Sequence, residues 1–147
     1  MSEQQKAYEV LQQQYQLPTY QDFDAEFDLQ DIEHMNLKAL VHIQSERLAY
    51  LQKITEELLH PDGGLMSMME ASVPKNQEAL LHLFQHICYH IRKAQEVLLR
   101  QEGMDSFIKQ VYEIYPQLRK ELATYIGDAA QFWKQEKQTT HNPAYFG

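Results

Sequence analysis

The sequence predicts an all-α protein, a helical bundle of three long helices plus an N-terminal helix, on three observations. Apolar residues recur at spacings of three and four over long stretches, which is the period of a helix face. Val, Ile and Thr never form the alternating run that is typical of strands. The 147 residues are 44% hydrophobic, which suffices for one core. We therefore expect a single helical-bundle domain over residues 1–147.

The N-terminal helix is predicted over residues 3–16, where the apolar side is weak. Leu17-Pro18 ends this helix, because the residue before a proline avoids helical backbone angles. Thr19 then resembles the N-cap of a short helical turn that reaches Phe27. The N-terminal part of the chain therefore predicts two short helical pieces.

The first long helix is predicted from a cap at Asp28 to about His60, where Pro61 and two glycines end it. The second runs from the turn at residues 72–74 to about Gln101. Both carry apolar residues at the spacing of a buried stripe. The two expected stripes are Ile32, Leu40, Ile43, Leu51, Ile54 and Leu58, and Leu80, Phe84, Ile87, Ile91, Ala94 and Leu98.

The last long helix is predicted from a cap at Asp105 to about Gln138, with Phe132 among its inward residues. Pro116 lies inside this pattern, where it removes one backbone hydrogen bond and clashes one turn back. We therefore expect a helix that is kinked or split near Pro116. Residues 139–147 are expected to form a non-helical tail, docked by Tyr145 and Phe146 on the bundle or on a neighbouring copy.

Acidic residues concentrate in residues 1–37, which hold eight acids and one lysine, a net charge of −7. No dense basic cluster appears, so neither nucleic acid nor an anionic membrane is an expected partner. No run approaches the length of a membrane span, and the polar N-terminus shows no signal peptide. These features predict a cytoplasmic protein.

Three short motifs resemble small uncharacterised α-helical proteins of archaeal type. They are the Leu17-Pro18 pair before an acidic and aromatic run, the His60-Pro61-Asp62 break, and the segment Ser67-Met68-Met69-Glu70. The resemblance covers about the first half of the chain. It implies a helical fold and no particular activity.

Three histidines, His82, His86 and His90, recur at a spacing of four, and Glu78 lies one turn earlier. This spacing places the side chains on one helix face, where neighbouring imidazoles can share a transition metal. A helical wheel puts the row opposite the apolar stripe. We therefore expect exposed histidines without a stoichiometric metal, and a metal site remains the alternative.

The acidic segment 22–33 matches part of a calcium-binding loop. Asp22, Asp24, Glu26, Asp28, Gln30 and Glu33 occupy positions 1, 3, 5, 7, 9 and 12 of an EF-hand. The sixth position needs glycine for its sharp turn, and here it is Phe27. We expect Phe23 and Phe27 to pack against the bundle instead, with no calcium loop.

Arg47 projects onto the apolar stripe of the first long helix, with Gln44 beside it. A buried charge is costly unless it is paired, so we expect either a carboxylate partner from the acidic N-terminal segment or a buried aliphatic stem whose charged group reaches solvent. The alternative is an anion or small ligand in a pocket near Arg47.

The leading hypothesis is a non-enzymatic helical interaction or scaffold protein that presents helix faces to another protein or to its own copy, without a cofactor. The first alternative is a metal-binding bundle that uses the histidine row or the acidic segment 22–33. The second is a small-ligand binder with a pocket near Arg47.

Overall fold

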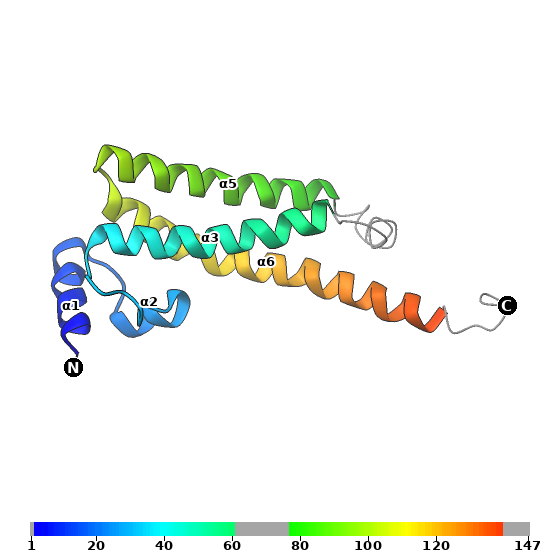
Figure 1. Ribbon diagram of the computed structural model, residues 1–147, viewed down its shortest axis with the longest axis horizontal. Coiled ribbons are helices and arrows are strands. Elements are labelled where there is room, and N and C mark those ends of the chain that lie inside the picture. Colours follow the sequence, from blue (N-terminus) through cyan, green and yellow to red (C-terminus); the bar gives the residue numbers. More distant parts are fainter. Residues whose placement is uncertain (1, 61–76, 140–147) are drawn as a thin grey trace.

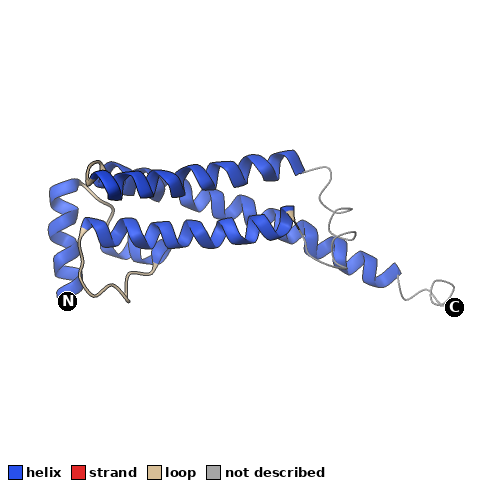
Figure 2. Ribbon diagram, turned by 45° about the horizontal axis from the view of Figure 1, so that its top comes forward, coloured by secondary structure: helices blue, strands red, loops and turns tan. Residues whose placement is uncertain are grey.

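The computed structural model describes residues 2–60 and 77–139, where the regular structure is helical throughout (Figures 1 and 2). The predicted all-α fold is thus confirmed for this part of the chain. The start of the second long helix at 72–74 and the docked tail fall on residues outside it. The helices are α1 (Glu3–Tyr15), α2 (Tyr20–Phe27), α3 (Leu37–Leu59), α5 (Gln77–Arg100) and α6 (Met104–Thr139).

Side chains cap the first two helices, and the sequence predicts the second of these caps. The Ser2 hydroxyl accepts a hydrogen bond from the backbone N–H of Gln5 at 3.1 Å and so begins α1. The Thr19 hydroxyl accepts one from the N–H of Asp22 at 3.2 Å and begins α2. Each bond satisfies an N–H that has no partner inside its helix.

The prediction that Asp28 caps the first long helix is wrong. Asp28 lies in the left-handed region, with φ of 56°, and ends α2. The Asp24 carboxylate holds this end by accepting a hydrogen bond from the N–H of Leu29 at 2.7 Å. The helix α3 begins nine residues further on, where the Asn36 side chain accepts from the N–H of Ala39 at 2.8 Å. Asp and Asn are both good caps, and Asp28 serves the C-terminus of one helix instead of the N-terminus of the next.

The three long helices α3, α5 and α6 pack side by side, each antiparallel to the next along the chain (Figure 1). Two hydrogen bonds fix their register: Gln52 Nε2 donates to Cys88 Sγ at 3.2 Å, and Gln44 Nε2 donates to the Ile108 carbonyl at 3.0 Å. Most of their buried residues alternate spacings of three and four, as in a coiled coil. These are Val41, Gln44, Leu48, Leu51, Thr55 and Leu58 on α3, Leu80, Leu83, Ile87, His90, Ala94 and Val97 on α5, and Ile108, Val111, Tyr115, Leu118 and Leu122 on α6.

The predicted stripe of α5 is displaced to one side. Leu80, Ile87 and Ala94 are buried as expected, but the other three predicted residues are only half-buried. Leu83, His90 and Val97 take their places in the core. Both sets have the same alternating spacing and share half their members, so the packing of α5 against α3 and α6 decides which set is buried.

The last helix, α6, is a single helix from Met104 to Thr139 and is not split at Pro116. The kink there remains a prediction. Figure 1 shows that α6 continues past the ends of α3 and α5. The Phe132 side chain lies outside the described part of the structure.

The two short helices cover one end of the bundle (Figure 1). Phe23 and Phe27 are fully buried, as predicted, and Phe23 stacks on Tyr112 of α6 with ring centroids 5.8 Å apart. The buried Tyr8 of α1 donates its hydroxyl to the Pro18 carbonyl at 2.6 Å. Aromatic packing therefore holds the acidic segment against the long helices.

None of the helices in residues 2–60 and 77–139 combines the length and the apolar character that crossing a bilayer requires.

Candidate functional site

The structure divides the histidine row between solvent and core. His82 and His86 are exposed on α5, and Glu78 is exposed near the start of that helix. His90 is only 2% exposed and occupies a core position between Ile87 and Ala94. The expectation of a fully exposed row is therefore wrong for His90, because the buried stripe of α5 is displaced toward it.

The His90 side chain is a neutral imidazole held in an apolar core. Burial, and secondly the neighbouring His86, whose ring centroid is 4.9 Å away, together lower the pKa of His90 to about 4. The Nδ1 atom of His90 is buried without a hydrogen-bond partner. Within residues 2–60 and 77–139, no three His, Cys, Asp or Glu side chains gather closely enough to hold a metal ion.

The acidic segment 22–33 forms a helix followed by a connecting loop, so its carboxylates do not converge as those of an EF-hand do. Asp22, Asp24 and Glu26 lie in the helix α2. Asp24 caps the end of this helix, as described above, and Glu26 pairs with Arg119 of α6 at 3.3 Å. The carboxylate of Asp28 accepts from the N–H of Gln30 at 3.4 Å. Several of these acids thus have structural roles.

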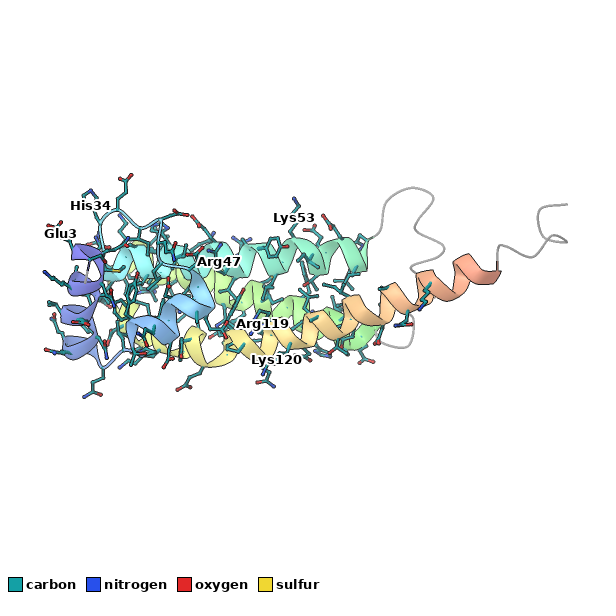
Figure 3. All side chains as sticks on the ribbon, turned by 90° about the horizontal axis from the view of Figure 1, so that it is seen from below. Glu3, His34, Arg47, Lys53, Arg119 and Lys120 are labelled. Atoms are coloured by element: carbon teal, nitrogen blue, oxygen red, sulfur yellow. The ribbon has the colours of Figure 1, made fainter. Side chains whose placement is uncertain are left out.

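Arg47 has a different partner from the carboxylate that we predict. Its Nε and Nη2 atoms both donate to the Phe27 carbonyl, at 3.2 Å and 3.0 Å. This carbonyl ends α2, where carbonyls lack intrahelical partners and the helix dipole is negative. Figure 3 shows Arg47 on α3 and Arg119 on α6 at the side of the bundle that α2 covers. The guanidinium of Arg47 therefore fixes α2 on α3.

Gln44 is fully buried and joins two helices. Its Nε2 atom donates to the Ile108 carbonyl of α6, while its Oε1 atom is buried without a partner. An amide in this position costs stability but favours one register of the two helices over others. We interpret Gln44 as a structural residue.

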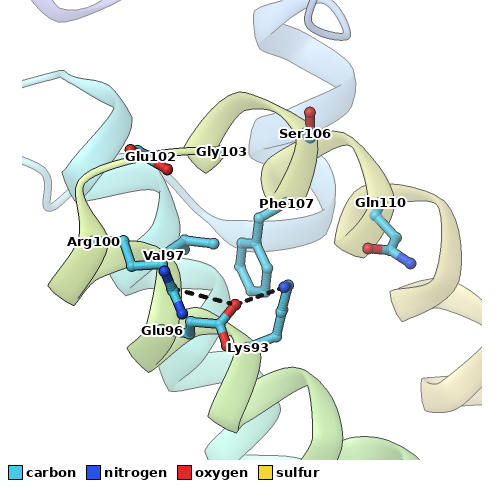
Figure 4. Close-up of a pocket in the computed structure, with 9 residues that line it drawn as sticks. All are labelled: Lys93, Glu96, Val97, Arg100, Glu102, Gly103, Ser106, Phe107 and Gln110. Carbon is cyan, nitrogen blue, oxygen red and sulfur yellow. Dashed lines mark hydrogen bonds and ion pairs between the residues drawn. The ribbon is translucent and has the colours of Figure 1, made fainter.

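Among the open depressions on the described surface, two are lined by charged or histidine side chains. One, of about 330 Å³, lies at the turn between α5 and α6, where Lys93 and Arg100 both reach Glu96, at 2.7 Å and 3.9 Å (Figure 4). The other, of about 450 Å³, lies between the 28–36 loop and α3, and its lining includes His34, His42 and Glu46. The cations of the first are already paired with a carboxylate.

An uncharged strip runs along the outer face of α5, and the sequence reasoning missed it. We define the α5 strip by Leu81, His82, Gln85, His86 and Tyr89, all of which are exposed. The Leu81 side chain is 44% exposed and that of Tyr89 is 58% exposed. The signal was present in the sequence, since Leu81 and Tyr89 lie eight residues apart, two helical turns, and away from the apolar stripe.

No protein-family model, curated protein or solved structure matches this chain. The resemblance to archaeal-type helical proteins therefore stays a prediction.

Proposed function

We propose that this protein is a helical binding module that recognises another protein surface through the α5 strip. The observation that supports this most directly is the exposure of Leu81 and Tyr89, at 44% and 58%, on one face of a helix packed firmly against two others. Aromatic and large apolar side chains are the residues that dominate the energy of protein interfaces.

The composition of the strip agrees with this proposal. Its other members are a glutamine and two histidines, which supply hydrogen bonds without a net charge when the imidazoles are neutral. Charged residues are depleted at the centre of interfaces, and here Glu78 and Arg92 lie beyond the two ends of the strip. A rigid helix also loses little conformational entropy when it binds.

A metal-binding role has one supporting observation. His82 and His86 are both exposed and lie one helical turn apart, a spacing that suits a transition metal. Two ligands leave a metal incompletely coordinated, so a site here would need donors from a bound partner. If zinc tightens the association with a partner, and the His82→Ala substitution abolishes that effect of zinc, this second role is supported.

The test of the protein-binding role is site-specific photo-crosslinking. A photoreactive phenylalanine analogue at Gln85 in the native cell should form a discrete adduct with protein, either a second copy or a different chain. Adding Leu81→Glu and Tyr89→Glu should remove the adduct, because two buried charges would disrupt the contact.

Tyr50 of α3 provides a matched control. Its side chain is 64% exposed, comparable with that of Tyr89, but it lies on another helix. The Tyr50→Glu substitution should leave the adduct at position 85 unchanged. Failure of position 85 to form any protein adduct, in a cell extract that contains the folded protein, would contradict the proposed function.

A further inference from the structure

The residues along the outer face of α5 are arranged symmetrically about Gln85. Leu81 and Tyr89 lie four residues before and after it. Glu78 and Arg92 lie seven residues before and after it, and both are exposed. Four and seven residues are one and two helical turns, so all five side chains share one face.

This arrangement is self-complementary. If a second α5 lies antiparallel to the first with its Gln85 opposite Gln85, each Leu81 meets the Tyr89 of the other copy. At both ends of the contact, the Glu78 carboxylate meets the Arg92 guanidinium. A two-fold axis requires such pairing, in which each residue faces the symmetry-related position of its partner.

We propose that the surface recognised by the α5 strip is the α5 strip of a second copy, bound antiparallel about a two-fold axis next to Gln85. This inference rests on the proposed function and names its partner.

The present hydrogen-bond partner of Arg92 favours this pairing. Its Nη1 atom donates to the neutral Gln95 side chain at 3.1 Å. A carboxylate is a stronger acceptor for a guanidinium than an amide, so the Glu78 of a second copy would improve on the present contact. A parallel arrangement would instead place Glu78 against Glu78 and Arg92 against Arg92.

The distribution of charge also favours antiparallel copies. Residues 1–37 carry a net charge of −7, and α1 and α2 lie at the end of the bundle where α5 finishes (Figure 1). An antiparallel pair keeps the two acidic ends far apart, at opposite ends of the dimer. A parallel pair would bring them to the same end, where like charges repel.

The contact is short. From Glu78 to Arg92 the helix rises about 21 Å, at about 1.5 Å per residue. The surface area that such a contact buries lies at the small end of the range for specific interfaces. We therefore expect a dimer that forms reversibly at micromolar concentrations. Reversing the charge of Glu78 or of Arg92 alone should weaken the dimer, and reversing both together should restore it.

The test uses engineered disulfides in the full chain, with the native Cys88 replaced by alanine. Gln85→Cys should form a covalent dimer under mild oxidation, because the axis places position 85 next to itself. Glu78→Cys and Arg92→Cys should each stay monomeric alone and cross-link when mixed. Tyr50→Cys should not cross-link in any mixture.

A charge exchange tests the same geometry without cysteine. Glu78→Arg should weaken dimerisation at least about tenfold, because each end then pairs two cations. Combining it with Arg92→Glu should restore the dissociation constant to within about threefold. Circular dichroism of each variant checks that the helices persist.

The dimer proposal is overturned if position 85 gives no covalent dimer, if Glu78→Cys cross-links with itself, or if the double charge exchange fails to restore association. The photo-crosslinking experiment separates these failures from failure of the proposed function. An adduct of position 85 with a different protein would keep the binding role and remove the second copy as its partner.

Discussion

Replacing His90 by leucine should change how the stability of the bundle depends on pH. His90 is 2% exposed, occupies a core position of α5 and has a buried Nδ1 without a partner. Burial and the nearby His86 lower the pKa of His90 from 6.5 to about 4. The unfolded chain therefore binds a proton at His90 more readily than the folded chain does.

The sign and size of the effect follow from this difference. Because the folded-state pKa is the lower one, the free energy of unfolding falls as the pH drops below 6.5, and the loss is complete below pH 4. One pH unit between the two values corresponds to about 1.4 kcal/mol. The wild-type chain should thus lose about 2 kcal/mol at pH 5 and about 3 kcal/mol at pH 4 through His90 alone.

Urea unfolding of the wild type and of His90→Leu, monitored by circular dichroism at several values from pH 7 to pH 4, measures this loss. The loss is the difference between the two curves of unfolding free energy against pH. Effects of pH that are common to both proteins cancel in the difference. His82→Leu supplies the control, because it removes an exposed histidine from the same helix and leaves His90 in place. Parallel pH curves for the wild type and His90→Leu would refute the reasoning.

Three further substitutions test the packing, each read from the free energy of unfolding in urea. Ile87→Ala removes a fully buried core side chain and should cost about 2–5 kcal/mol, so a loss below about 1 kcal/mol would contradict the assigned seam. Arg47→Met leaves the Phe27 carbonyl without its two donors and should cost about 2 kcal/mol, with faster hydrogen exchange in α2 as the specific sign. Gln44→Leu removes a buried oxygen without a partner together with one hydrogen bond to Ile108, and should leave stability within about 1 kcal/mol of the wild type.

Sequence periodicity and capping chemistry predicted most of the helical architecture. The Leu17-Pro18 stop and the Thr19 cap were deducible because each depends on neighbours within a few residues, and the burial of Phe23 was deducible from the apolar spacing of its own helix. The position of Asp28 was predicted wrongly for the same local reason. Its side chain suits a cap, and only the packing of α2 against α3 and α6 decides which helix it serves.

The candidate sites were harder to predict because they depend on which way each helix is turned. A stripe through Phe84 and Ile91 and a stripe through Leu83 and His90 have the same period, and the more hydrophobic one was the natural choice. The packing of α5 against α3 and α6 buries the second stripe, and His90 lies in the core. Rotation of this kind is set by contacts between distant parts of the chain, so periodicity alone does not determine it.

The partner of Arg47 was missed for another reason. A charge on an apolar face indicates that some acceptor exists, and the acidic segment offered several carboxylates. The acceptor is the backbone carbonyl of Phe27, which is available because α2 ends there. Backbone acceptors at helix ends become visible only once the ends are known.

Sedimentation velocity of the purified full chain tests most directly whether the α5 strip is a binding surface for a second copy. From about 1 to 200 μM, a range that spans the micromolar affinity expected of a small interface, the wild type should shift from monomer to dimer. The Leu81→Glu/Tyr89→Glu variant should stay monomeric, and Tyr50→Glu should behave as the wild type. A wild type that stays monomeric throughout, or a double variant that dimerises equally well, would contradict the account.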